Sequence, residues 1–196
     1  MHGADRIHRP GILHVTLVGA AVAWSCDAMH VHTGTISYPQ PWLLGQAWWV
    51  APGFAATFLT MAIVYLLLAQ RVSAFVATTE SRRPGTSGDF AETLAAFAFS
   101  YLLSGFGSRE PALLSAIFLG SFLLRWWLTY ERAWLLLLAS LMAVGGMLGE
   151  GLLGWAGLAA YAHADVFHVP LWLGGLYLHG AFALRQSMRF FVYAER

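Results

Sequence analysis

Long hydrophobic runs, separated by short polar segments, dominate this sequence. They cover residues 11–29, 47–69, 89–107, 112–130, 133–160 and 168–192. A helix needs about 20 predominantly apolar residues to cross the hydrocarbon core of a bilayer, and each run meets or approaches that length. The pattern therefore predicts an all-α polytopic membrane protein, a six-transmembrane-helix bundle that forms a single domain over residues 1–196.

The arginines predict the orientation of the bundle. With the N-terminus in the cytoplasm, every arginine except Arg109 falls in a segment on the cytoplasmic side. Loops that stay in the cytoplasm carry the excess of Lys and Arg in membrane proteins. We therefore expect both termini to be cytoplasmic.

Composition and charge narrow the class of function. The chain is 58% hydrophobic and 11% charged, whereas soluble domains carry about 25% charged residues. A formal net charge of +1 argues against a nucleic-acid partner. The single cysteine, Cys26, excludes an internal disulfide and a CxxC metal site. Nothing in the sequence calls for a cofactor.

One carboxyl group stands out inside the fifth run, because Glu150 is the only charged residue between 133 and 162. Helical spacing places it on one face with three glycines: Gly146, Gly154 and Gly157. This face indicates either close packing against a neighbouring helix, with His179 as a possible partner for Glu150, or a polar anchor inside a ligand pocket. Gly145 and Gly149 form a GxxxG pattern that favours self-association, for which a trimer is our working guess.

A second group of polar side chains is placed on the non-cytoplasmic side by this topology. Imidazole and carboxylate are competent ligands for zinc and other divalent metals, so the group could serve a small membrane enzyme acting on a lipid or isoprenoid. The alternative is ordinary polar residues at the level of the lipid headgroups. The residues are Asp27, His30, His32, His163, Asp165 and His168.

No HExxH, Ser-His-Asp or phosphate-loop arrangement supports catalysis, so we assign no catalytic and no metal-binding residue. A transporter would be expected to show paired intramembrane ionisable groups or broken helices, and the sequence shows neither. The tryptophans near the ends of the runs are typical of interfacial anchoring.

Several short motifs resemble the Insig family of membrane sterol sensors, in the right order and on matching runs. AWWVAP (47–52) is similar to the family's AWWVPP, and LRWWLTYER (124–132) to LWWTFDR. YAHADVFHVPLWL (161–173) is similar to YTSPDFLYVRSWL, and ALRQSM (183–188) to the closing GRQL. The residues that match by position are Trp48, Trp49, Trp126, Trp127, Asp165 and Trp172.

The resemblance implies a non-enzymatic protein with six spans that binds sterols inside its bundle and holds protein partners in the endoplasmic reticulum membrane. Two positions depart from the family. Leu113 stands where the family has a glutamine that contributes to sterol binding. Tyr130, followed by Glu131, aligns with an acidic residue that contributes to partner binding.

The residue pattern and the family resemblance both agree with a bacterial homologue in the inner membrane. We expect it to bind a neutral amphipathic lipid, either a diacylglycerol-like molecule or a sterol. Its protein partner is not identified by the sequence. We expect a mostly apolar pocket among spans two to five. The expected lipid-binding residues are Phe54, Phe58, Phe97, Tyr101, Phe118, Phe122, Trp126, Gly146 and Glu150.

Overall fold

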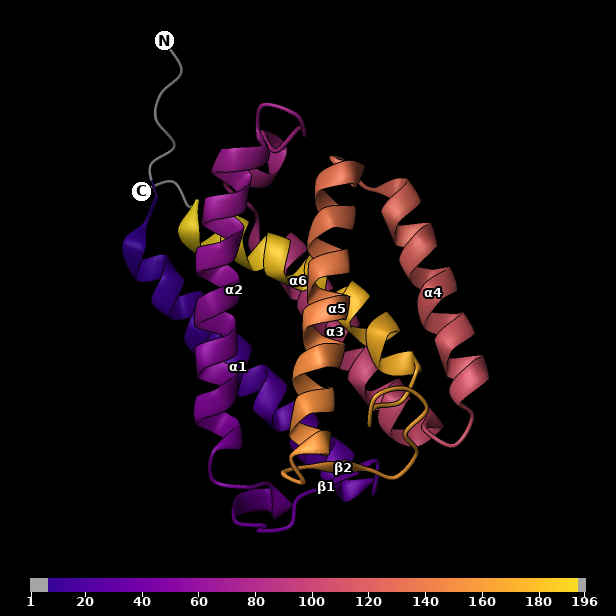
Figure 1. Cartoon of the computed structure of the whole chain (residues 1–196). Helices are drawn as coiled ribbons and strands as arrows, with labels where there is room; N and C mark the ends of the chain where they lie inside the picture. The colour runs from indigo at the N-terminus through magenta and orange to yellow at the C-terminus, as the bar shows by residue number, and fades with distance from the viewer. Residues whose placement is uncertain (1–6, 194–196) are drawn as a thin grey trace.

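The computed structural model describes residues 7–193 and is dominated by helices (Figure 1). The long helices are α1 (Arg9–His32), α2 (Val50–Val72), α3 (Ser87–Gly107), α4 (Pro111–Leu128), α5 (Arg132–Trp155) and α6 (Trp172–Ser187). A π-helical segment, η3 (Met188–Val192), continues α6, and two 3-10 turns lie in loops, η1 (Leu43–Gly45) and η2 (Glu80–Arg82). The predicted six-helix bundle is confirmed.

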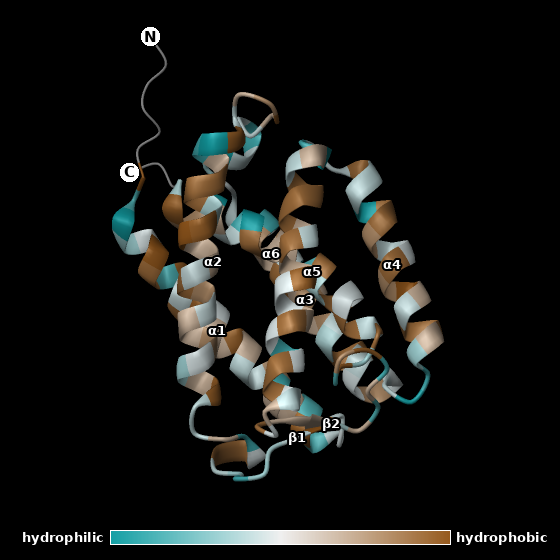
Figure 2. Ribbon diagram, viewed as in Figure 1, coloured by the Kyte–Doolittle hydropathy of each residue, from teal (hydrophilic) through white to brown (hydrophobic). Residues whose placement is uncertain are grey.

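Within the described chain, α1 to α5 are each long and apolar enough to cross a membrane. Hydrophobic residues run along these helices, and many of the hydrophilic ones lie near the helix ends and in the loops (Figure 2). The sixth helix differs because its α-helical part has 16 residues, which η3 extends by five. Most of its residues are buried, so α6 is the central helix of an integral membrane protein.

Local sequence explains where several helices begin. Pro10 and Pro111 lie in the first turns of α1 and α4, where the missing N–H group costs no helical hydrogen bond. The Thr86 hydroxyl accepts a hydrogen bond from the backbone N–H of Asp89 and so caps α3. Asp89 adds a negative charge in the first turn, where the helix dipole stabilises it.

The helices pack around α6, which contacts α3, α4 and α5. On the other side of the bundle α1 packs against α2, α3 and η3, whereas α2 packs mainly against α1. Gly11 lets α1 approach η3 closely, because a Cβ atom there would collide with the backbone carbonyl of Phe191. Burial of apolar side chains between these helices forms two clusters, one around Trp134 and one around Trp172.

One end of the bundle carries two short antiparallel strands, β1 (Ile36–Ser37) and β2 (Ala160–Tyr161) (Figure 1). We call it the β1–β2 end. A tight turn at Phe167 and His168, both with positive φ, packs against Gly151 and Gly154 of α5. The helix ends at Trp155.

The prediction that Gly157 shares a helical face with Glu150 is therefore wrong. Gly157 lies beyond α5 with a φ of +67°, a conformation that glycine adopts at little cost. It turns the chain toward β2 and does not contribute to a helical face.

The opposite end, where α4 meets α5, is held by charged groups. The Arg185 guanidinium of α6 donates to the Tyr130 carbonyl at 3.1 Å and to the Thr129 hydroxyl at 2.7 Å. The Glu131 carboxylate accepts the backbone N–H groups of Glu80 and Ser81 at 2.7 and 2.9 Å. These bonds fix Glu131 in a left-handed conformation, with a φ of 46°.

Candidate functional site

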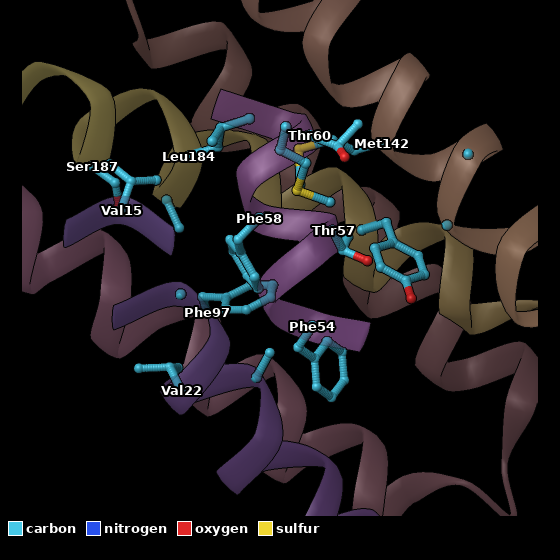
Figure 3. A pocket seen from close by; sticks show the side chains of 18 of the residues that line it. Val15, Val22, Phe54, Thr57, Phe58, Thr60, Phe97, Met142, Leu184 and Ser187 are labelled. Atoms are coloured by element: carbon cyan, nitrogen blue, oxygen red, sulfur yellow. The ribbon is translucent and has the colours of Figure 1, made fainter. Parts of the chain in front are cut away.

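A cavity of about 610 Å³ lies inside the bundle (Figure 3). Its wall is formed by side chains from α1, α2, α3, α5 and α6. This volume is in the range of small-molecule sites. The structure thus differs from the expected placement among spans two to five, because α1 and α6 contribute and α4 does not.

The wall is predominantly apolar. Figure 3 shows Val15 and Val22 of α1, the Phe54 and Phe58 rings of α2, and Phe97 of α3 among the lining residues. Apart from the tyrosines, Glu150 is the only ionisable residue among the described residues that line the cavity. The cavity therefore suits a ligand that is mostly hydrocarbon.

The cavity is open on one side, between α2 and α5. Lining residues of α2 that are exposed include Thr57, Thr60 and Val64, and those of α5 include Leu141 and Gly145. These positions lie in the middle of spanning helices. An opening at that level faces the hydrocarbon of a bilayer rather than water.

The GxxxG glycines lie at this opening. A Cβ atom at Gly145 or Gly149 would meet no atom within 4 Å, and both residues line the cavity. Within the described chain this glycine pair does not pack against another helix. Because neither glycine has a side chain, the cavity is wide at that point.

Glu150 lies in the wall of the cavity toward the β1–β2 end. Its Oε1 accepts a hydrogen bond from the Tyr177 hydroxyl at 3.1 Å, and the Tyr161 hydroxyl is a second donor. Gly146 makes the first contact possible, because a Cβ there would lie 2.5 Å from the Tyr177 ring. Burial, and then the Glu150 carboxyl, raise the pKa of Tyr161, so that its phenol keeps the proton it donates.

Asp27 lies close enough to Glu150 for the two carboxyl groups to interact electrostatically. Its Oδ2 accepts from the Tyr38 hydroxyl at 2.9 Å and from Gln46 Nε2 at 2.6 Å. Burial raises the pKa of Tyr38, and the neighbouring Asp27 raises it further. Two acidic side chains surrounded by neutral donors thus occupy this end of the protein.

Of the residues expected to bind lipid, the structure brings six to the cavity wall: Phe54, Phe58, Phe97, Tyr101, Gly146 and Glu150. The three residues of α4 lie elsewhere. Phe118 and Phe122 are buried against α6, with their rings facing His179. Trp126 donates from Nε1 to the Arg132 carbonyl at 3.0 Å and so supports the α4–α5 junction.

His179 is not the partner of Glu150, so that interpretation of the sequence is wrong. Its Nε2 lies 3.1 Å from the Ser121 hydroxyl and 3.1 Å from the Phe118 carbonyl, both in α4. The correct partner, Tyr177, is two residues earlier in the same helix. Successive residues of a helix point about 100° apart, so His179 and Tyr177 lie on different faces of α6. The sequence does not determine how α6 is rotated about its axis in the bundle.

The proposed metal ligands are not brought together. Among residues 7–193, no three His, Cys, Asp or Glu side chains form a group that could hold a metal ion. Asp27 is engaged by Tyr38 and Gln46, and His30 Nε2 lies 2.8 Å from the Ser104 hydroxyl. Asp165 accepts the Leu171 N–H at 2.9 Å, which orders the loop before α6.

The positions that carry the family resemblance have different surroundings. Trp48 and Trp127 are exposed, as expected of residues that contact lipid, whereas Trp172 is fully buried beside His30. Leu113 is also exposed and lies on α4, outside the cavity wall. The departure from the family at Leu113 therefore does not alter the cavity.

Sequence reasoning missed the contribution of α1 and α6. Val15, Val18 and Val22 of α1 line the cavity, as do Tyr177 and Leu184 of α6. The spacing of the three α1 residues is helical and would have indicated one face. Nothing in the sequence distinguishes a face that lines a cavity from one that packs against a neighbour.

Known proteins support the fold. No protein-family model matches this sequence, and no curated protein matches it either. Among solved structures, a mycobacterial Insig homologue from Mycobacterium vanbaalenii is similar, with a TM-score of 0.74 and 21% identity over 94% of this chain and 95% of that one. A cross-linked trimer of an Arg-to-Cys variant of that protein gives a TM-score of 0.71 and 22% identity over 94% and 96%. The chain therefore has the fold of a bacterial Insig homologue.

Proposed function

We propose that this protein is a non-enzymatic membrane protein that binds a neutral amphipathic lipid, a diacylglycerol-like molecule or a sterol, and acts as a lipid sensor. The observation that carries the proposal is the apolar cavity of about 610 Å³ that opens between α2 and α5 at mid-membrane depth. A hydrocarbon ligand in the bilayer can reach such a site without crossing water.

The packing of α2 supports the sensing part of the proposal. This helix contacts mainly α1, whereas α5 is packed against α6. A ligand between α2 and α5 would bridge two elements that share little interface. Occupancy would therefore change how firmly α2 is held, and a partner protein could detect that change.

The likeness to the mycobacterial Insig homologue supports a sensor function and an oligomeric assembly for this chain. Because that protein has been crystallised as a cross-linked trimer, we propose that this chain also forms a homo-oligomer, most simply a trimer. We further propose that the end carrying Arg71, Arg83, Arg132 and Arg189 faces the cytoplasm, because positive residues stay on that side. The host membrane is then the bacterial inner membrane, or the endoplasmic reticulum if the source is eukaryotic.

Filling the opening tests the proposal. Gly149→Leu adds a side chain where a Cβ meets no atom within 4 Å, so the helix tolerates it while the cavity narrows. Gly120→Leu is the matched control, because Gly120 is an exposed glycine on α4 that also has open space around it and lies outside the cavity. The measurement is mass spectrometry of lipids retained by protein purified in mild detergent.

We expect the wild type and Gly120→Leu to retain a defined neutral lipid at a stoichiometric ratio, and Gly149→Leu to lose most of it. Bulk phospholipid alone in all three samples would contradict the proposal. Conversion of an added diacylglycerol or sterol into a new product would instead favour an enzyme.

A further inference from the structure

The phenol nearest the buried end of the cavity, Tyr101, has no hydrogen-bond partner among the described residues. The Tyr101 side chain lines the cavity and is 6% exposed. Its ring packs against His30 and Phe97, while its hydroxyl makes no hydrogen bond to another described residue. Buried phenols nearly always have a hydrogen-bond partner, so this hydroxyl indicates a missing one.

The groups around Tyr101 belong to the same end of the cavity. The Tyr101 phenol interacts electrostatically with Asp27 and Glu150. Tyr177 interacts with the same two carboxyl groups and with Tyr101. Glu150 and Tyr177 line the cavity together with Tyr101, whereas Asp27 lies behind the wall. A ligand group placed here meets both a free donor and a carboxyl acceptor.

The charge at this end selects against phosphate. Two carboxyl groups, Asp27 and Glu150, are held by neutral donors, and no Arg, Lys or His lies among the described residues of the cavity wall. A phosphate would bring a negative charge to a place with no counter-charge, where its desolvation is not compensated. An uncharged hydroxyl can donate to a carboxyl oxygen and accept from Tyr101 at no such cost.

Farther along the wall, two of the hydroxyls are already bonded: Thr60 donates to the Ala56 carbonyl and Tyr65 to the Ser81 carbonyl. The Thr57 and Ser187 hydroxyls also line the cavity, but no carboxyl group accompanies them there. The lining residues Val15, Leu138 and Leu184 belong to the apolar cluster around Trp134. This part of the cavity accommodates hydrocarbon.

We propose that Tyr101 and Glu150, supported by Tyr177, form a recognition site for an uncharged hydroxyl head group, so that the ligand lies with its hydroxyl toward the β1–β2 end and its hydrocarbon along α2 and α5. The proposal rests on the proposed lipid-binding function. It adds which chemical group is read, by which residues, and in which orientation.

The test uses pairs of probes that differ only at the hydroxyl. Dioleoylglycerol is compared with its 3-acetyl ester and with dioleoyl phosphatidic acid, and cholesterol with its methyl ether. Binding of each probe to the full-length protein in detergent is measured by competition with a fluorescent diacylglycerol. We expect capping of the hydroxyl to weaken binding about tenfold and phosphate to weaken it at least as much. The pair that binds more tightly identifies the source of the hydroxyl, glyceride or sterol.

Variants locate the effect. Glu150→Gln should reduce the discrimination between dioleoylglycerol and its acetyl ester to less than about threefold, and Tyr101→Phe should weaken dioleoylglycerol about tenfold. Tyr38→Phe is the control, since Tyr38 bonds Asp27 in the same cluster but does not line the cavity. It should keep the discrimination of the wild type.

Two results separate the failures. If no probe binds the wild type, the proposed lipid-binding function is wrong. If free and capped probes bind equally well, or if Tyr38→Phe removes the discrimination as completely as Glu150→Gln does, lipid binding stands and the head-group site is wrong.

Discussion

At the end where α4 meets α5, the buried guanidinium of Arg185 donates to Tyr130 and Thr129 and stacks over the Tyr130 ring at 4.3 Å. At the β1–β2 end, the Glu150 carboxyl is bonded by phenols and still forms part of a cavity wall. Both ends bury an ionisable side chain in an apolar molecule. A buried ionisable group whose bonds all go to the fold is structural, whereas one that also faces open space is available to a ligand.

Removing the guanidinium should have the largest effect on stability. Arg185→Ala leaves the Tyr130 carbonyl and the Thr129 hydroxyl without their donor in a buried place, which we expect to lower the free energy of unfolding by about 3 kcal/mol. Thermal unfolding in detergent, followed by tryptophan fluorescence, measures it. Arg132→Ala is the control, because exposed Arg132 makes one 3.4 Å hydrogen bond to Thr129 and an exposed contact with the Trp127 ring, and its loss should cost about 1 kcal/mol or less. Equal losses would remove the structural role given to Arg185.

Glu131 tests the same end with a carboxylate. Glu131→Gln keeps one acceptor oxygen but loses the charge that serves two backbone N–H groups, so we expect a loss of about 1–2 kcal/mol. Glu80→Gln provides the comparison, since Glu80 forms an exposed ion pair with Arg83 and should change stability by less than about 0.5 kcal/mol. The same unfolding assay serves both, and a larger loss for Glu80→Gln would contradict the assignment.

At the β1–β2 end, Glu150→Gln should affect lipid retention more than stability. The amide oxygen can still accept from Tyr177 and Tyr161, so we expect the free energy of unfolding to change by less than about 1 kcal/mol. The retained neutral lipid should nevertheless fall severalfold in mass spectrometry. A variant that is strongly destabilised but keeps its lipid would place Glu150 with the structural charges.

The smallest effect concerns alkaline pH. Burial raises the pKa of Tyr38 and Tyr161 in the folded protein, so folding favours their protonated forms. That stability is fully present below the ordinary tyrosine pKa of about 10 and is lost as pH rises above it. Unfolding measured between pH 8 and 11 should show declining stability above pH 10, and a weaker decline in Tyr38→Phe. An identical decline in both proteins would exclude Tyr38 as a contributor.

Hydropathy predicted most of the fold. Six runs became six helices, because in a bilayer each span must satisfy its own backbone hydrogen bonds and its length is fixed by the membrane. The central, buried position of α6 is less predictable from the sequence. Its sequence contains Arg185 and Gln186, which are buried through bonds to the α4–α5 junction that lies more than 50 residues away along the chain.

The candidate site was harder to predict than the fold. Glu150 draws attention in the sequence because a lone carboxyl in an apolar helix must find partners, and the structure places it in the cavity wall with Tyr177 as a donor. The prediction that the aromatic residues of α4 line the cavity rests on the family resemblance of the fourth run and on the glycine face of the fifth. Phe118 and Phe122 instead pack on α6. Periodicity gives the faces of a helix, but the rotation of each helix in the bundle depends on its neighbours.

The opening between α2 and α5 also determines which ligand concentration controls the occupancy of the cavity. A ligand that enters there arrives by lateral diffusion within the membrane, so site occupancy follows the mole fraction of that lipid in the bilayer. Adding inert phospholipid would empty the site even though the amount of ligand per cell stayed constant. Under the proposed function, the protein would respond to the lipid composition of the membrane in which it lies.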